Sequence, residues 1–207
     1  MRRMYLYLLN TLADWETGYV IAELGSGRYC KSPEFTYTLV LCGKTRDPIT
    51  TMGGMMLTPE ITLTEITPGP EDLLILPGGD TWFNPEQNEV LSLVPKFMDA
   101  GMVVGAICGA TMGLAQAGHL NSRPHTSNDP DVLRMFCPGY GGSAYYQNEP
   151  AVLDGNLITA SGLAPVEFAS QIFSRLGVMH EATRDAWYQL YTTRRPEFFH
   201  ALMASLQ

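Results

Sequence analysis

The stretch Val103-Val104-Gly105-Ala106-Ile107-Cys108-Gly109-Ala110-Thr111 is more informative about the fold than any other part of the chain. It is an apolar run that ends on a lone cysteine, and small residues follow at once. This pattern predicts a buried strand, a sharp turn at Cys108 and a helix that begins directly after the turn. Glycine and alanine leave room for the strained backbone that such a nucleophile elbow requires.

A cysteine in this turn has two possible roles. As a reactive group it would lie at a helix N-terminus, which favours the thiolate, and the amides after the turn would stabilise an oxyanion. Such surroundings lower the pKa of a thiol from about 8.5 to between ~3.5 and ~7.5. The alternative is a packing residue, because free cysteine is among the most buried residue types.

The composition limits the possible partners. The chain has 207 residues, enough for one sizeable α/β domain, and its 45% hydrophobic and 16% charged residues are typical of a globular core. A net charge of −8 without a basic cluster argues against nucleic-acid binding. No stretch reaches the ~20 apolar residues of a membrane-spanning helix. We therefore expect neither nucleic acid nor membrane as a partner.

The cysteines indicate the type of protein. Their positions, which show no metal-ligand spacing, are Cys30, Cys42, Cys108 and Cys137. We therefore expect no metal site and no cofactor. The apolar run at 4–9 is too short for a secretory signal and is typical of a first strand. These features predict a reduced, cytoplasmic protein.

Strand and helix patterns alternate along the chain. Strands are predicted at 4–9, 37–42, 72–76, 102–107, 151–153 and 157–159, with a hairpin at 53–57, and helices at 15–26, 88–100, 109–118, 129–135 and 165–176. The alternation predicts an α/β fold with a mainly parallel sheet and helices on both faces. Asp154-Gly155 is a tight-hairpin signal between the last two strands.

Two strand ends point to a common site. Ligands of parallel sheets bind beyond the carboxyl ends of the strands. Pro77-Gly78-Gly79 and Cys108 each follow a strand directly, and Ser161-Gly162 follows another. We therefore expect these segments to line one crevice.

Acidic residues and one histidine are candidates for proton transfer. Asp14 and Glu16 follow the first strand, although Asp14 is a good N-cap for the next helix and acidic residues are favoured in first turns, so the residues alone favour this structural role. His125 lies in a polar loop after the elbow helix, which suits a general base.

Four segments together resemble the ThiJ/PfpI superfamily, which includes intracellular proteases and the parkinsonism-linked deglycase and shares a core with class I glutamine amidotransferases. They are Ala13-Asp14-Trp15-Glu16-Thr17, Leu74-Ile75-Leu76-Pro77-Gly78-Gly79, Ala106-Ile107-Cys108-Gly109 and Asp154-Gly155-Asn156-Leu157-Ile158-Thr159-Ala160-Ser161. The resemblance implies a flavodoxin-like α/β sandwich over residues 1–177, with residues 178–207 as a C-terminal helical extension on the same domain. It also implies a homodimer.

The resemblance assigns roles to residues. Cys108 would be the nucleophile, and Glu16 a buried acid that donates a hydrogen bond to the thiolate, which requires a raised pKa. The two groups would then titrate as a pair. The amides of Gly79 and Gly109, with Gly78 beside them, would form the oxyanion and substrate site. His125 falls where the deglycase-like branch carries its pocket histidine.

Gly109 departs from the pattern of the protease and amidase branch, which places a histidine directly after the cysteine. The departure argues against proteolysis and passes the role of base to His125 or Glu16.

The C-terminal extension is rich in aromatic residues and divides into two helical stretches at Pro196. Their helical spacing is typical of a packing face, against either the core or a second subunit. The alternative is a lid or a substrate wall.

The sequence favours an enzyme whose Cys108 attacks a small amide, acyl or reactive carbonyl substrate. Glyoxalase-like or deglycase-like aldehyde chemistry is an alternative within that class. A second hypothesis is an oxidative-stress sensor, since a low-pKa thiolate beside an acid oxidises readily. A third is a binding module that uses the aromatic helices and does not need Cys108.

Overall fold

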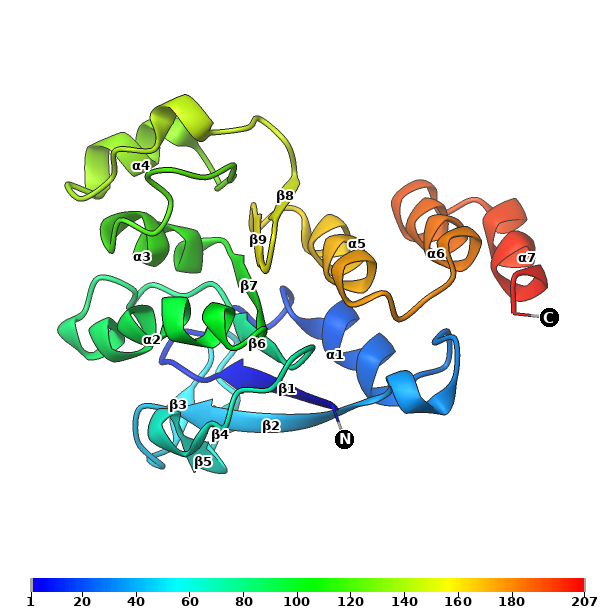
Figure 1. The fold of residues 1–207 in the computed structure, drawn as a ribbon, viewed down its shortest axis with the longest axis horizontal. Helices are drawn as coiled ribbons and strands as arrows, with labels where there is room; N and C mark the ends of the chain where they lie inside the picture. Colours follow the sequence, from blue (N-terminus) through cyan, green and yellow to red (C-terminus); the bar gives the residue numbers. More distant parts are fainter. Residues whose placement is uncertain (1, 207) are drawn as a thin grey trace.

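The computed structural model describes residues 2–206, which form one seven-stranded sheet with helices on both faces (Figure 1). The strand order is β5-β2-β1-β6-β7-β9-β8, and all neighbours pair in parallel except β8 with β9. The strands are β1 (Arg2–Tyr7), β2 (Tyr37–Gly43), β5 (Ile61–Thr62), β6 (Leu73–Leu76), β7 (Val103–Ile107), β8 (Ala151–Asp154) and β9 (Leu157–Ala160). The predicted mainly parallel α/β sheet is confirmed.

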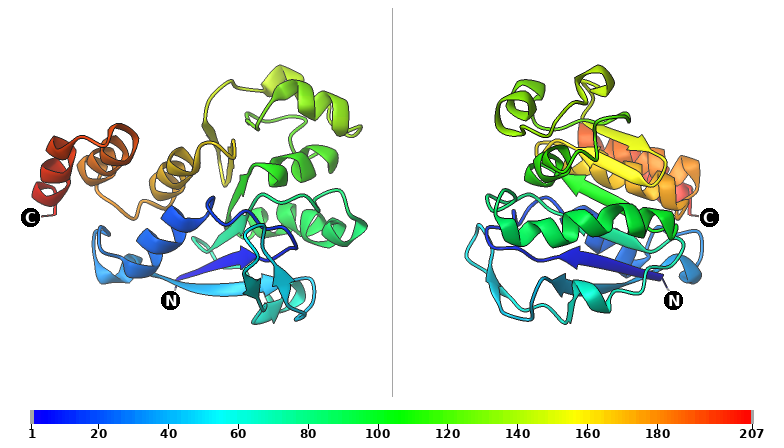
Figure 2. Two further views of the ribbon diagram at one scale, coloured as in Figure 1. Left: turned by 180° about the vertical axis from the view of Figure 1, so that it is seen from behind. Right: turned by 60° about the vertical axis from the view of Figure 1, so that its left-hand side comes forward.

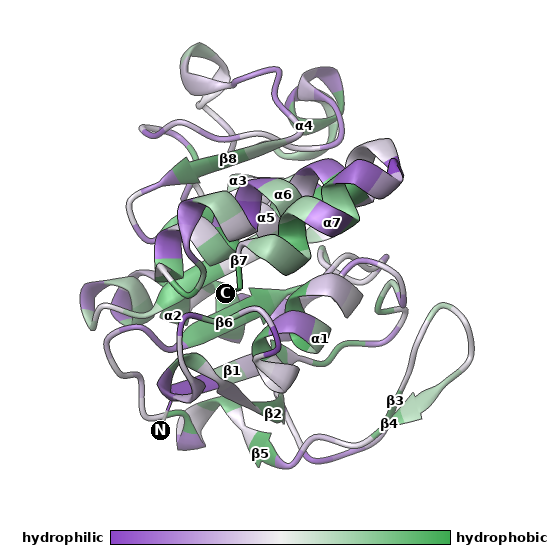
Figure 3. Cartoon of the chain, turned by 90° about the vertical axis from the view of Figure 1, so that its right-hand side faces the viewer, coloured by the Kyte–Doolittle hydropathy of each residue, from purple (hydrophilic) through white to green (hydrophobic). Residues whose placement is uncertain are grey.

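The two central strands are apolar along their whole length because helices cover both faces. Every residue of β6 and β7 is buried, and both strands are mostly green in Figure 3. Such runs cannot alternate between polar and apolar residues, since neither face of the strand meets water.

Helices form a layer on each side of the sheet (Figures 1 and 2). One face carries α1 (Gly18–Ser26) and α5 (Pro165–Leu176), and the other carries α2 (Asn88–Asp99) and α3 (Gly109–Gln116). The short α4 (Pro130–Phe136) lies beside α3. This is the expected flavodoxin-like sandwich. Among residues 2–206, no helix is both long and apolar enough to cross a membrane.

The C-terminal helices α6 (Glu181–Thr193) and α7 (Pro196–Ala204) pack outside α5 (Figure 1). Trp187 of α6 is fully buried, and its ring packs edge-on against Phe173 and Tyr19. The indole N–H of Trp187 donates a 3.0 Å hydrogen bond to Glu23 in α1. The aromatic residue at the centre of the extension is therefore part of the core.

Two details of the first half differ from the prediction. The helix expected to begin at residue 15 begins at Gly18, so Glu16 lies in the loop before it. Asp14 does not cap that helix, because its carboxylate accepts a 2.6 Å hydrogen bond from the amide of Gly53. Gly53 lies in the turn between β3 (Ile49–Thr50) and β4 (Met56–Leu57), which form a separate two-stranded sheet. The predicted hairpin is thus present, and its first strand begins before residue 53.

Candidate active site

The elbow at Cys108 has a strained backbone. Its φ of 58° and ψ of −123° lie in a region that costs a non-glycine residue about 1–3 kcal/mol. Three hydrogen bonds hold this conformation: the amide of Cys108 donates to Ala160 O at 3.0 Å, and its carbonyl accepts from the amide (3.0 Å) and hydroxyl (2.6 Å) of Thr111. The thiol is therefore fixed at the carboxyl end of β7, where α3 begins.

Glu16 is fully buried beside the elbow and is only half satisfied by hydrogen bonds. Its Oε2 accepts a 2.5 Å hydrogen bond from the amide of Gly78, and its Oε1 has no hydrogen-bond partner. Burial raises the pKa of Glu16 to about 7, against the opposing effects of the Gly78 bond and of the adjacent Cys108 thiol. A protonated Oε1 is available as a donor, because Gly78 already fixes the other oxygen as an acceptor.

Two glycines enclose the thiol and the acid. A Cβ at position 78 would lie 2.5 Å from Glu16 Oε1, and a Cβ at position 162 would lie 2.8 Å from Cys108 Sγ and 3.1 Å from Glu16 Oε1. Any side chain at either position would displace the pair. Gly78 gives its amide to Glu16, so it positions the acid and does not present that amide to a substrate.

Asn128 contacts the sulfur directly, and sequence reasoning missed it. Its Nδ2 donates a 3.3 Å hydrogen bond to Cys108 Sγ. Its Oδ1 accepts from the amide of Gly162 at 2.8 Å and from the hydroxyl of Ser161 at 3.4 Å. Since an amide N–H requires an acceptor, the Gly162 bond fixes which end of Asn128 faces the sulfur. The only signal in the sequence is its place in the polar loop after the elbow helix.

The surroundings of Cys108 act on its pKa in both directions. Burial raises the pKa of the thiol, and the negative charge of an ionised Glu16 raises it further, whereas the bonds from Asn128 and the Gly109 amide lower it. The net direction is upward, the opposite of the decrease expected from a helix N-terminus alone. Glu16 and Cys108 therefore compete for a proton, and its location determines whether the sulfur is a nucleophile.

Gly109 cannot be replaced without moving its neighbours. A Cβ at this position would lie 2.5 Å from Gly79 O and 3.0 Å from Trp82 Cδ1. A histidine does not fit here. The backbones of Gly79 and Gly109 meet instead, and both residues line the pocket beside the thiol.

The structure does not bring His125 to the thiol. The side chain is buried, with Nδ1 2.8 Å from Arg123 O and Nε2 2.9 Å from the hydroxyl of Tyr140. Burial also lowers the pKa of His125. Both ring nitrogens are engaged away from the sulfur, because the loop turns this side chain toward Tyr140 and presents Asn128 in its place. His125 therefore has no geometry for a catalytic base here.

The thiol opens into a pocket of about 300 Å³ at the carboxyl ends of β1, β6 and β7. Its lining consists of Glu16, Cys108, Gly79, Gly109 and Asn128, together with Ala13, Trp15, Met52, Asp80, Trp82, Phe83 and Met112. No residue of α6 or α7 is in this lining. The C-terminal extension is therefore neither a lid nor a wall of this pocket.

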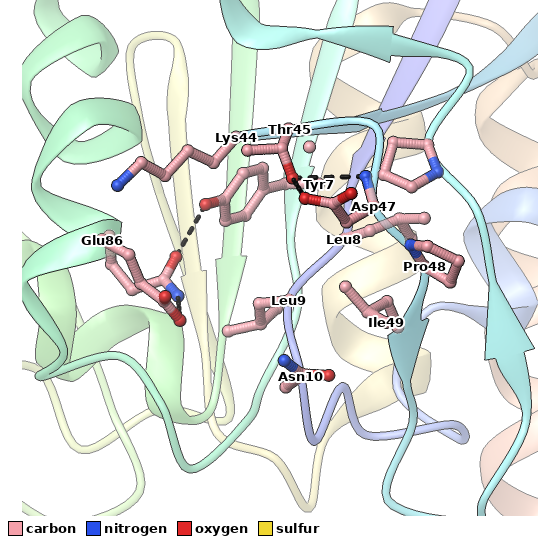
Figure 4. Close-up of a pocket in the computed structure, with 13 residues that line it drawn as sticks. Tyr7, Leu8, Leu9, Asn10, Lys44, Thr45, Asp47, Pro48, Ile49 and Glu86 are labelled. Carbon is pink, nitrogen blue, oxygen red and sulfur yellow. Dashed lines mark hydrogen bonds between the residues drawn. The ribbon is translucent and has the colours of Figure 1, made fainter.

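A second hollow of about 300 Å³ lies beyond the ends of β1 and β2 (Figure 4). Tyr7 contributes its hydroxyl, which donates to Gln87 Oε1 at 2.7 Å, and Lys44 and Asp47 also line the hollow. This hollow contains no cysteine, so the thiol pocket is the better candidate for covalent chemistry. Among residues 2–206, no three His, Cys, Asp or Glu side chains are grouped to hold a metal ion.

Comparison with known proteins identifies the family of the chain. Residues 2–175 match the DJ-1/PfpI family, which is nearly the whole chain. The chain belongs to the DJ-1/PfpI family. An "uncharacterized protease YoaZ" of Bacillus subtilis is 47% identical over 205 residues, which cover 99% of this chain and 98% of that protein. The family resemblance found in the sequence is thus confirmed.

Solved structures of DJ-1/PfpI proteins share the fold. A thiJ/pfpI family protein from Bacillus anthracis superposes with a TM-score of 0.95 at 44% identity, covering 99% of this chain and 96% of that one. A DJ-1 superfamily protein from Agrobacterium tumefaciens gives 0.78 at 30% identity, covering 94% and 100%. The 0.95 match extends over the C-terminal helices, which lie beyond the segment that matches the DJ-1/PfpI family.

Proposed function

We propose that this protein is a cysteine-dependent enzyme that acts on a small amide, acyl or reactive carbonyl compound. The observation that carries the proposal is the pairing of a strained, half-buried thiol with a buried acid whose second oxygen has no partner. A buried carboxyl group with one unmatched oxygen is costly in a purely structural role. It is useful where a proton has to be given and taken back.

The first step forms a bond between the Cys108 sulfur and the carbonyl carbon. The thiol proton is held by Glu16, and the thiolate electron pair forms the new S–C bond. The π pair of the carbonyl moves onto oxygen, where the amides of Gly79 and Gly109 stabilise it. One such donor contributes roughly 3–4 kcal/mol in known enzymes.

For an amide or ester, the oxyanion then collapses and breaks the bond to the amine or alcohol. Protonated Glu16 supplies the proton that the departing group needs, which leaves an acyl thioester on Cys108. Water attacks the thioester, Glu16 accepts its proton, and the thiolate leaves. The sum is the consumption of one water and one amide or ester, with acid and amine or alcohol as products.

A 2-oxoaldehyde takes the same first step and yields a hemithioacetal. Glu16 would then move a proton from the former aldehyde carbon to its neighbour, giving a 2-hydroxyacyl thioester that water hydrolyses. Both versions use the same thiol and acid. The geometry favours small substrates over proteins in either case, because the pocket is about 300 Å³ and position 109 has no room for a histidine.

A redox sensor is the second candidate, and Asn128 is the observation that favours it. Oxygen atoms added to Cys108 would find the Asn128 amide and a protonated Glu16 as donors. Treatment with hydrogen peroxide followed by mass spectrometry tests this role. Selective oxidation of Cys108 to the sulfinic acid, without turnover of any carbonyl probe, would favour the sensor over the enzyme.

The homodimer and the cytoplasmic location remain predictions. The C-terminal extension packs against α5. Analytical ultracentrifugation tests the predicted homodimer by measuring the mass of the protein in solution.

The deciding experiment compares Cys108→Ser with Cys30→Ser. Cys30 is another half-buried free cysteine, outside the pocket. We expect Cys108→Ser to lower turnover of 4-nitrophenyl acetate and of methylglyoxal by roughly a thousandfold or more, and Cys30→Ser to leave it unchanged. Equal turnover of wild type and Cys108→Ser would overturn the proposal and favour the binding module.

A further inference from the structure

The mouth of the thiol pocket is walled by large apolar side chains that remain open to solvent. Trp15 is 54% exposed, Met52 47% and Phe83 47%. All three line the same pocket as Cys108. A concave site surrounded by exposed apolar groups is typical of a ligand site, because a bound apolar group removes this surface from water.

These walls come from separate loops, and backbone or side-chain contacts hold each loop. The indole of Trp15 donates a 3.4 Å hydrogen bond to Gly162 O, beside the thiol. The amide of Met52 donates to Leu12 O at 2.9 Å, which fixes the β3–β4 turn against the loop after β1. Phe83 follows Trp82, whose buried indole donates to Pro77 O at 2.9 Å. The apolar wall is therefore anchored to the same loops that form the site.

The charges in the pocket are all acidic. Glu16 and Asp80 are its ionisable carboxyl groups, and no Lys, Arg or His is among its lining residues. An anionic substrate would meet Asp80 without a compensating cation, and a carboxylate or phosphate group that leaves water needs such a partner.

We infer that the substrate is an uncharged carbonyl compound with an apolar, aliphatic or aromatic substituent, which Trp15, Met52 and Phe83 receive while Asp80 excludes anions. This inference rests on the proposed function, whose thiol it uses, and adds the class of substrate. It excludes carboxylated and phosphorylated carbonyl compounds. At about 300 Å³ the pocket is at the small end of ligand sites, which span ~300–1,000 Å³.

The charge preference is tested by alkylation of Cys108 with iodoacetamide and iodoacetate, which differ by one negative charge. Rates are read by mass spectrometry and divided by those of glutathione. We expect the normalised ratio to favour iodoacetamide by about three- to tenfold, and Asp80→Asn to reduce that preference. The matched control is Asp99→Asn, an exposed acid at the end of α2 that does not line the pocket. An unchanged preference in Asp80→Asn would overturn the role of Asp80.

The apolar preference is tested with N-methylmaleimide and N-benzylmaleimide, again normalised to glutathione. We expect Cys108 to prefer the benzyl reagent by about fivefold or more, and Phe83→Ala and Trp15→Ala to remove most of that preference. Phe199→Ala is the matched control, because Phe199 is also 47% exposed and lies in α7. A preference that is absent in wild type, or equal in Phe83→Ala and Phe199→Ala, would overturn the inference.

The alkylation measurements test the inferred substrate class independently of the proposed enzyme activity, because alkylation needs the pocket and the sulfur but no turnover. Selective labelling without any turnover would leave the pocket assignment standing and contradict the enzyme. Turnover that depends on Cys108, with unselective labelling, would support the enzyme and contradict the substrate class.

Discussion

Glu16 and Glu23 lie seven positions apart in the sequence, and both carboxyl groups are buried. Glu23 accepts hydrogen bonds from Arg28 Nε at 2.7 Å, Arg28 Nη2 at 2.5 Å and Trp187 Nε1 at 3.0 Å. Glu16 accepts one, from the amide of Gly78, and its Oε1 has no partner. The two differ in how many donors surround them.

The difference separates a structural acid from a chemical one. Arg28 compensates the charge of Glu23, and the carboxylate joins α1 to the C-terminal helices through Trp187. No cation is bonded to Glu16, and burial therefore raises its pKa to about 7. Burial with full pairing serves to join elements of the fold, whereas burial with incomplete pairing gives a group that exchanges protons near neutral pH.

The largest expected effect is on stability, from Glu23→Leu. The variant leaves the Trp187 indole N–H buried without its acceptor and leaves Arg28 unpaired. We expect the free energy of unfolding in urea to fall by about 3 kcal/mol, the low end for breaking a buried pair because Arg28 is half-exposed. Glu197→Gln, which breaks the exposed pair with Arg195, is the control and should change it by less than about 0.5 kcal/mol. An equal loss of unfolding free energy in Glu23→Leu and Glu197→Gln would show that the buried bonds of Glu23 contribute no more than an exposed ion pair, and would contradict its structural role.

The next effect is on the thiol, from Glu16→Leu compared with Glu16→Gln. In the glutamine variant Oε1 can accept the Gly78 bond while Nε2 donates to the sulfur. A protonated Glu16 carries no charge that raises the pKa of Cys108, and it donates a hydrogen bond to the thiolate. If the acid acts in this form, we expect Glu16→Gln to raise the pKa of Cys108 only modestly, and Glu16→Leu to raise it by about 1 to 2 because a hydrogen bond to a charged group is lost. The pH dependence of iodoacetamide labelling measures both. If Glu16→Leu lowers the pKa of Cys108, the acid acts as an anion and the donor role is wrong.

The smallest expected effect is a dependence of stability on pH. The pKa of Glu16 is about 7 in the folded protein against 4.5 ordinarily, so the folded state binds the extra proton between these values. This stabilisation is complete below pH 4.5 and is lost as the pH rises through 7. Relative to Glu16→Gln, wild type should lose about 1.3 kcal/mol of unfolding free energy between pH 6 and pH 8, the range around the folded-state pKa. A constant difference across this range would show that Glu16 remains ionised.

The sequence was sufficient where the decisive signal is local. The apolar run at 103–107 with small residues after Cys108 predicts the strand, the elbow and the helix, because each follows from neighbouring residues. The mainly parallel pairing of the sheet also follows from the alternation of strands and helices. The glycines at 78 and 79 could be placed near the thiol because the carboxyl ends of parallel strands share one edge, whereas the choice of Glu16 over Asp14 came from the resemblance to the ThiJ/PfpI superfamily.

Contacts between distant segments could not be predicted from the sequence. Trp187 and Glu23 are 164 positions apart, and nothing in either segment indicates the other. Asn128 was missed in favour of His125 because residue type suggested a base, whereas the path of the loop decides which side chain faces the sulfur. The sequence analysis expected a lowered pKa for a reactive Cys108, whereas burial raises it. This direction was wrong because the burial of the thiol depends on the whole fold.

Position 109 has an evolutionary consequence. A histidine there would collide with Gly79 O and Trp82, so a single codon change toward the protease-like pattern would disrupt the elbow before it supplied a base. A productive route would need the loop at 77–82 to shift first, which makes the order of mutations matter. The effect of any side chain at position 109 therefore depends on the residues at Gly79 and Trp82, and libraries that vary position 109 should vary Trp82 with it.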